Sequence, residues 1–131
     1  MRKAIQGVFA LSAGLALSST AWADNRSRVN AFVLSDGSFE VVAEFTENAL
    51  YWCGASEAAR EVALPNTQRL YVLNGPAPSQ AVPGARAVRF GVTPPADAAS
   101  GGSFTNSVNV VGNSLTVFQA RQTCNERSAS G

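Results

Sequence analysis

The only two cysteines of this chain, Cys53 and Cys124, constrain its fold more than any other feature. An even number of cysteines in an exported domain is typical of disulfides, because compartments outside the cytosol are oxidising. A bridge would close a loop of about 70 residues, which the chain-entropy model values at roughly 4 kcal/mol. Two independent thiols or a redox pair are the alternatives, but the sequence has no C-x-x-C spacing. We therefore expect a structural Cys53–Cys124 disulfide.

The N-terminus predicts that the chain is exported. Two basic residues precede a mostly apolar stretch at residues 4–17, and small residues follow it. This order is typical of a cleavable signal peptide, whose peptidase accepts small side chains such as Ala21 and Ala23. A membrane anchor is the alternative, but the stretch is shorter than the ~20 residues of a spanning helix and is interrupted by polar residues and glycines. We predict a signal peptide at residues 1–23, with cleavage before Asp24.

Residues 24–131 have a length that suits one small domain with one hydrophobic core. They carry eight arginines, no lysine and nine acidic residues, which gives a net charge of −1. This near-neutral charge differs from the basic footprint of a nucleic-acid-binding domain. We expect no membrane span after signal removal, a periplasmic or secreted location, and a protein or envelope component as partner.

Asp36 and Gly37 separate two apolar-rich segments and predict a β-hairpin, because both residues of the tightest hairpin turns adopt positive φ. A two-residue turn at this position pairs Leu34 with Phe39. The resulting alternation directs the apolar residues of the second strand to one face and Glu40 to the other. We interpret the face of Glu40 as solvated.

The apolar period changes from two to about 3.6 between Ala49 and Ala63, which predicts a helix. Thr46 is its expected N-cap. Most of its apolar arc is alanine, and the arc includes Tyr51 and Trp52. These two aromatics either fill the core, as their place on the arc favours, or contact a partner. The polar residues of the helix fall on the opposite side, and Cys53 lies beside them.

Short apolar segments that alternate with Pro- and Gly-rich loops predict further strands after the helix. The resulting order, ββαββββ, indicates an α+β domain in which an antiparallel sheet of about five to six strands packs against one helix on one face. Two loops, Asn74–Gly84 and Thr93–Ser103, are candidate contact regions, because rigid scaffolds often present binding residues on loops. The expected strands are Arg28–Leu34, Phe39–Phe45, Arg69–Leu73, Ala87–Val92, Phe104–Val111 and Ser114–Ala120, the last two joined by a Gly112-Asn113 turn.

The sequence lacks the residues on which most catalytic mechanisms depend. It has no His, and its only Lys lies in the expected signal peptide. These absences remove the usual general base, the commonest metal ligand and Schiff-base chemistry. No Walker loop, G-x-G-x-x-G or zinc-ligand spacing occurs. We therefore predict no catalytic residue, no cofactor and no metal site.

Paired carboxylates are the catalytic chemistry that these absences leave open. Glu40 and Glu44 share one face of a strand, and Glu57 and Glu61 lie one helical turn apart. Two carboxylates that converge in a cleft, with Asp97 in a loop as a further candidate, would support glycoside hydrolysis. We interpret both pairs as solvated surface. A carboxylate-dependent hydrolase acting on envelope polymers stays open as the alternative function.

The run Tyr51-Trp52-Cys53-Gly54-Ala55, together with Arg69-Leu70-Tyr71-Val72 and the late Cys124, resembles small exported proteins of Gram-negative bacteria that have no assigned activity. The resemblance covers most of residues 24–131. It implies a periplasmic or secreted location and supplies no catalytic residue. We predict a small non-catalytic binding or accessory protein, with a structural envelope component as a further alternative.

Overall fold

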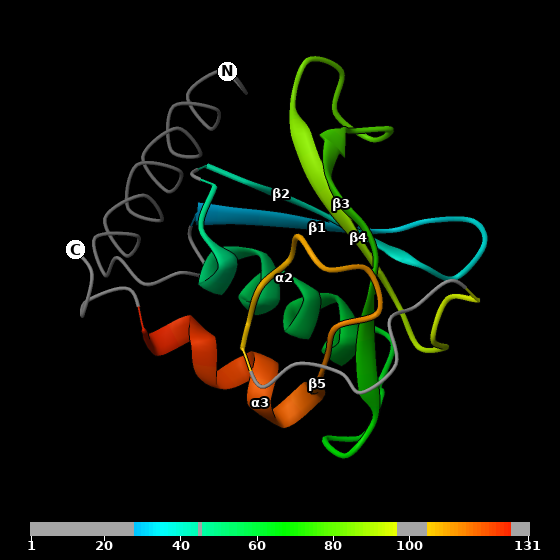
Figure 1. The fold of residues 1–131 in the computed structure, drawn as a ribbon, viewed down its shortest axis with the longest axis vertical. Coiled ribbons are helices and arrows are strands. Elements are labelled where there is room, and N and C mark those ends of the chain that lie inside the picture. Colours follow the sequence, from blue (N-terminus) through cyan, green and yellow to red (C-terminus); the bar gives the residue numbers. More distant parts are fainter. Residues whose placement is uncertain (1–27, 45, 97–104, 127–131) are drawn as a thin grey trace, which may run out of the picture.

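Among the residues that the structure describes, five antiparallel strands form one sheet in the order β1-β2-β4-β3-β5, and helix α2 lies across one face of it (Figure 1). This computed structural model describes residues 28–44, 46–96 and 105–126. The predicted signal peptide, with Ala21, Ala23 and Asp24, lies outside the described residues, and so does Asp97. The elements are β1 (Val29–Val33), β2 (Phe39–Ala43), α2 (Asn48–Glu61), β3 (Arg69–Pro78), β4 (Arg86–Gly91), β5 (Ser114–Thr116), α3 (Val117–Gln122) and the 3-10 helix η3 (Thr123–Asn125).

The predicted α+β class and antiparallel sheet are confirmed, but the last predicted hairpin is wrong. Residues 105–113 form turns and bends, β5 has only three residues, and α3 replaces most of the predicted strand Ser114–Ala120. The cause is a reciprocal cap. Thr116 Oγ1 accepts a hydrogen bond from Gln119 N–H at 3.1 Å, and Gln119 Oε1 accepts one from Thr116 N–H at 2.8 Å. This capping box starts a helix directly after Thr116.

The hairpin between β1 and β2 forms where it was predicted, but its register differs by one residue. Val33, not Leu34, pairs with Phe39. Leu34 N–H donates to Ser38 O at 2.8 Å, and Gly37 N–H donates to Leu34 O at 2.9 Å. Gly37 has a φ of 88°. The loop is therefore a three-residue connection in which Gly37 occupies the left-handed position of a bulge.

The core lies between the sheet and α2, and it includes both aromatic residues of the helix. Tyr51 and Trp52 are at most 1% exposed. The Trp52 ring lies 4.8 Å from that of Phe90 in β4, and its Nε1–H donates to Asn106 O at 2.7 Å. Burial raises the pKa of the Tyr51 hydroxyl. Both aromatics therefore fill the core, and neither is accessible to a partner in this conformation.

Helix α2 approaches the sheet closely at Gly54. A Cβ at this position would overlap Val41 Cγ1 of β2 and lie 3.4 Å from Val29 Cβ of β1. Val41 is fully buried and β-branched, so its side chain has little freedom to move aside. The glycine therefore sets the distance between α2 and the sheet.

The ends of α2 differ from the sequence prediction. The N-cap is Glu47, not Thr46, and no side chain caps it. The C-terminus closes in a Schellman motif, in which Leu64 N–H donates to Ala59 O at 2.9 Å and Ala63 N–H donates to a carbonyl of the preceding turn. Ala63 has a φ of 62°, a left-handed conformation that usually favours glycine.

The predicted Cys53–Cys124 disulfide is confirmed and joins α2 to η3. Both cysteines are fully buried, and their Cα atoms are 4.8 Å apart. Thr123 Oγ1 donates a hydrogen bond to Ala49 O at 3.0 Å, which ties η3 to the same helix. In the described part of the chain, no helix has the length and apolar character needed to cross a membrane.

Candidate functional site

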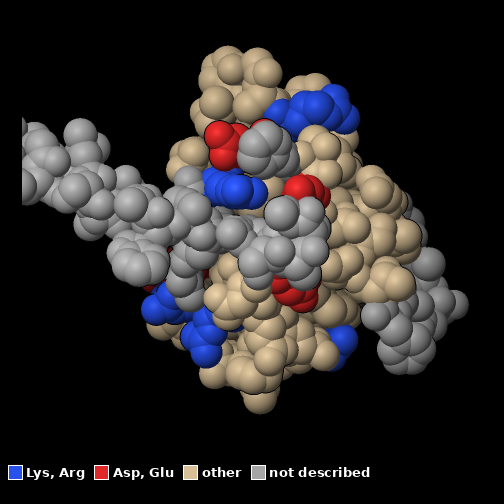
Figure 2. Space-filling view, turned by 90° about the vertical axis from the view of Figure 1, so that its left-hand side faces the viewer, with Lys and Arg blue, Asp and Glu red and all other residues tan. Residues whose placement is uncertain are grey.

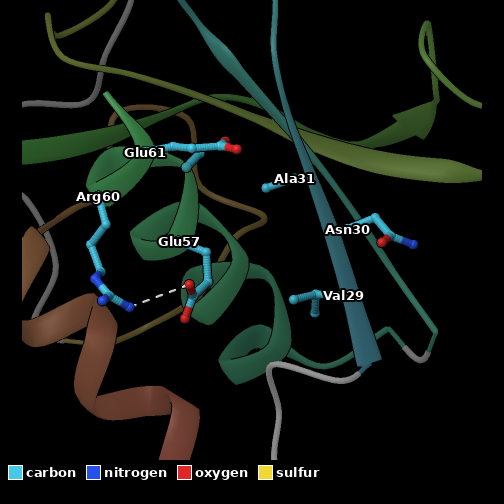
Figure 3. Close-up of a pocket in the computed structure, with 7 residues that line it drawn as sticks. Val29, Asn30, Ala31, Glu57, Arg60 and Glu61 are labelled. Atoms are coloured by element: carbon cyan, nitrogen blue, oxygen red, sulfur yellow. Dashed lines mark hydrogen bonds and ion pairs between the residues drawn. The ribbon is translucent and has the colours of Figure 1, made fainter. Parts of the chain in front are cut away.

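A groove of about 480 Å³ separates the edge strand β1 from α2 (Figure 3). The groove is open to solvent, and it has one uncharged wall and one charged wall. The wall formed by α2 supplies all the charged side chains of the lining, and the wall formed by β1 supplies none. The lining residues are Val29, Asn30 and Ala31 of β1, and Glu57, Ala58, Arg60 and Glu61 of α2.

Strand β1 lies at the end of the sheet and hydrogen-bonds to β2 along one side. At one end of the pairing, Leu34 N–H donates to Ser38 O, and at the other, Glu44 N–H donates to Arg28 O at 2.9 Å. Since hydrogen-bonded positions alternate in antiparallel strands, the even-numbered residues of β1 face β2. The odd-numbered residues direct their N–H and C=O groups to the free edge. These outward-facing residues are Val29, Ala31 and Val33.

The free edge of β1 lacks the features that usually prevent a strand from pairing with another chain. Its five residues, Val-Asn-Ala-Phe-Val, contain no charge and no proline, and their pairing with β2 is continuous. Natural edge strands usually carry charges, prolines or bulges, or are covered by other elements. Within the described ranges, no other strand pairs with this edge. Strand β1 can therefore accept a further strand.

The α2 wall of the groove has an excess of one negative charge. Arg60 and Glu57 form an ion pair at 3.5 Å, and their side chains are 51% and 29% exposed. In Figure 3, Arg60 extends toward Glu57, whereas the Glu61 side chain extends toward Ala31. Figure 2 shows acidic and basic side chains interspersed over the face that it views. The negative charge of the groove is therefore local.

Glu40, which we expected on a solvated face, is only 3% exposed, so this expectation is wrong. Its carboxylate accepts hydrogen bonds from Ser79 Oγ at 2.8 Å, Gln80 N–H at 2.8 Å and Ala81 N–H at 2.9 Å. Two register shifts bend β3 before this point, and the loop after β3 then reaches Glu40 on the sheet face opposite α2. Glu40 therefore anchors that loop.

The electrostatics of Glu40 suit an anchor and not a general acid. Burial alone would raise the pKa of its carboxyl, but the three hydrogen bonds and the Arg89 guanidinium outweigh burial and hold the pKa below its ordinary value. The pKa of Asp36 is also lowered, by hydrogen bonds from the side chain and backbone of Ser38. A catalytic general acid needs a raised pKa. Neither carboxyl is therefore suited to that role.

The remaining candidate carboxylates, Glu44, Glu57 and Glu61, do not share one site. Glu44 is exposed beyond the end of β2. Glu57 and Glu61, by contrast, line the same open groove. One cluster of potential metal ligands in the described residues combines Glu57 with Cys53 and Cys124. Both sulfur atoms belong to the disulfide, so they are not thiolate ligands in this state.

The two predicted contact loops are described to different extents. The first half of Asn74–Gly84 belongs to β3, and the second half forms the loop held by Glu40. Most of Thr93–Ser103 lies outside the described residues. The free edge of β1 was not identified from the sequence, because the hairpin pattern does not show which of its two strands pairs with β4.

Comparisons with protein-family models, with curated proteins and with solved structures found no match to this chain. The resemblance to small exported Gram-negative proteins therefore stays a prediction. The geometry of the groove and of the β1 edge is what defines the candidate site.

Proposed function

We propose that this chain is an exported, non-catalytic binding protein that takes up an extended polypeptide segment at the free edge of β1. The observation that carries the proposal is an uncharged edge strand, with three outward-facing residues, beside an open groove. Addition of a strand to an exposed sheet edge is a recurring mode of peptide recognition. Backbone hydrogen bonds supply affinity in this mode, and pockets for alternate side chains supply specificity.

The arrangement of the site suits an added strand. Neighbouring strands lie about 4.8 Å apart, and side chains opposite each other point to the same face of a sheet. A segment paired with Ala31 and its outward-facing neighbours would direct every second side chain toward α2. The groove between β1 and α2 provides space for those side chains.

The proposed location outside the cytosol is supported by the disulfide and by the N-terminal sequence. A buried structural disulfide is typical of proteins in the periplasm or outside the cell. N-terminal sequencing of the exported protein should start at Asp24. A protein that keeps residues 1–23 would contradict the predicted cleavage.

A carboxylate-dependent hydrolase receives less support from the geometry. Glu40 is occupied as an anchor, and Glu57 is paired with Arg60. Glu61 faces an open groove, whereas a general acid is usually tuned by burial or by a close like charge. A surface that binds a segment without changing it fits these residues better.

The test is a titration of the 15N-labelled protein with a short, end-capped peptide of alternating Val and Thr, followed by NMR. We expect the largest shifts in β1 and in the second half of α2. The variant Ala31→Pro should abolish binding and keep the fold, because the N–H that it removes faces the free edge and not β2. Ala31→Ser, which keeps that N–H, is the matched control. Binding that survives Ala31→Pro, or shifts confined to another face, would contradict the proposal.

A further inference from the structure

We propose that the groove selects extended segments that carry a Lys or Arg side chain on the face directed toward α2. This inference rests on the proposed function, because it names the chemistry of the segment that the β1 edge would take up. It is carried by the position of Glu61 opposite Ala31 and by the net negative charge of the α2 wall.

The space above Ala31 favours a long side chain at the neighbouring position of the added strand. Ala31 has the smallest side chain of β1, and it lies on the same face as Val29, toward α2. A long aliphatic stem can pack against these two residues while its charged end remains in solvent. Lys and Arg have such stems, and their charged ends would then reach the side of the groove where Glu61 lies.

The charged residues of the α2 wall determine whether the groove prefers a basic or an acidic side chain in the added segment. Glu61 has no ion-pair partner among the residues that the structure describes, and Figure 3 shows it extending across the groove. Arg60 is turned toward Glu57 and forms an ion pair with it. A basic side chain therefore meets an available carboxylate, whereas an acidic side chain at the same position meets a like charge. Charge complementarity of this kind contributes mainly to specificity.

The same observations favour a basic segment over a second copy of the chain. Strand β1 contains no basic residue, so edge-to-edge pairing of two copies through Val29–Val33 would place no cation from either strand against Glu61. A two-fold arrangement about Ala31 would also place both α2 helices on the same side of the joined sheet. The carboxylates of the two grooves would then lie on that shared side.

The experiment measures the affinity of the full protein for three end-capped peptides of alternating Val and Thr that differ only at a central residue, which is Lys, Gln or Glu. Fluorescence anisotropy should rank the affinities Lys above Gln above Glu, with steps of about two- to fivefold, the range expected for one exposed ion pair. High salt should shrink these steps, because exposed charges are screened. Glu61→Gln should remove the preference for Lys over Gln. Glu126→Gln, which neutralises an exposed carboxylate outside the groove, should leave the ranking unchanged.

The outcomes separate this inference from the proposed function. Equal binding of all three peptides at the β1 edge, lost in Ala31→Pro, would overturn the preference for basic segments and leave the binding function standing. A ranking that persists in Glu61→Gln would also overturn the inference. Absence of binding by any peptide, combined with dimerisation that Ala31→Pro abolishes in sedimentation equilibrium, would identify a second copy as the occupant and overturn both proposals.

Discussion

The close approach of α2 to the sheet predicts an effect of Gly54→Ala whose sign is opposite to that of helix propensity. In an exposed helix, alanine is more favourable than glycine by about 0.8–1.0 kcal/mol. At Gly54, the added methyl group would overlap Val41 Cγ1 and contact Val29. Overpacking of this kind costs about 1–3 kcal/mol. With the propensity gain subtracted, we expect Gly54→Ala to lower the free energy of unfolding by up to about 2 kcal/mol.

Urea unfolding of the oxidised protein, followed by circular dichroism, measures this difference. The control is a double-mutant cycle with Val41→Ala, which removes the side chain that the new methyl group would overlap. The effect of Gly54→Ala should be smaller, or reversed, in the Val41→Ala background, because the methyl group then occupies vacated space. If Gly54→Ala alone stabilises the protein by about 1 kcal/mol, as propensity requires, the close approach of helix and sheet described above is wrong.

Three further predictions concern the anchor, the helix end and the disulfide. The folded-state pKa of Glu40 is lowered, so the contribution of its carboxylate to stability is present above the unfolded pKa and is lost as the pH falls through the folded pKa. Urea titrations across acidic pH should show this loss of stability. Glu40→Gln should make the stability depend less on pH in that range. Glu40→Ala should cost about 1–3 kcal/mol, because it leaves buried donors of the loop without an acceptor, and unchanged stability would argue against the anchor. Ala63→Gly should raise the free energy of unfolding by about 0.5–1 kcal/mol by relieving the left-handed alanine, and a lower melting temperature would contradict that cap. Replacing both Cys53 and Cys124 by Ala should cost about 2–5 kcal/mol, whereas a loss below 1 kcal/mol in calorimetry would show that the bridge constrains little.

Local signals in the sequence predicted local structure well. The hairpin at Gly37, the helix that contains Trp52 and the Cys53–Cys124 bridge all follow from neighbouring residues or from a single pair. The prediction failed around Leu115, where the alternation favoured a strand. In the structure, the capping box between Thr116 and Gln119 starts a helix there instead.

The parts of the site that depend on distant contacts could not be predicted. The position of Glu40 in an alternating strand predicts a solvated side chain. Its burial depends on Ser79 and the loop that follows Ser79, some 40 residues later in the chain. That contact also requires the two register shifts in β3. Gly75, Pro76 and Pro78 mark this segment as irregular, but they do not show which residue the loop after it will contact. The exposure of the β1 edge likewise depends on β2 pairing with β4 and not on any residue of β1.

The order of the strands also has a consequence for the speed of folding. The hairpins β1–β2 and β3–β4 each close a short connection, but the pairing of β2 with β4 brings Phe39 against Phe90 across the intervening helix. The entropy lost in closing a loop grows with the logarithm of its length. Joining the two hairpins closes the chain from Phe39 to Phe90, which is the longest loop between paired residues of this sheet. Proteins rich in such non-local contacts fold slowly. We expect the docking of the two hairpins, and not the formation of either one, to limit the folding rate.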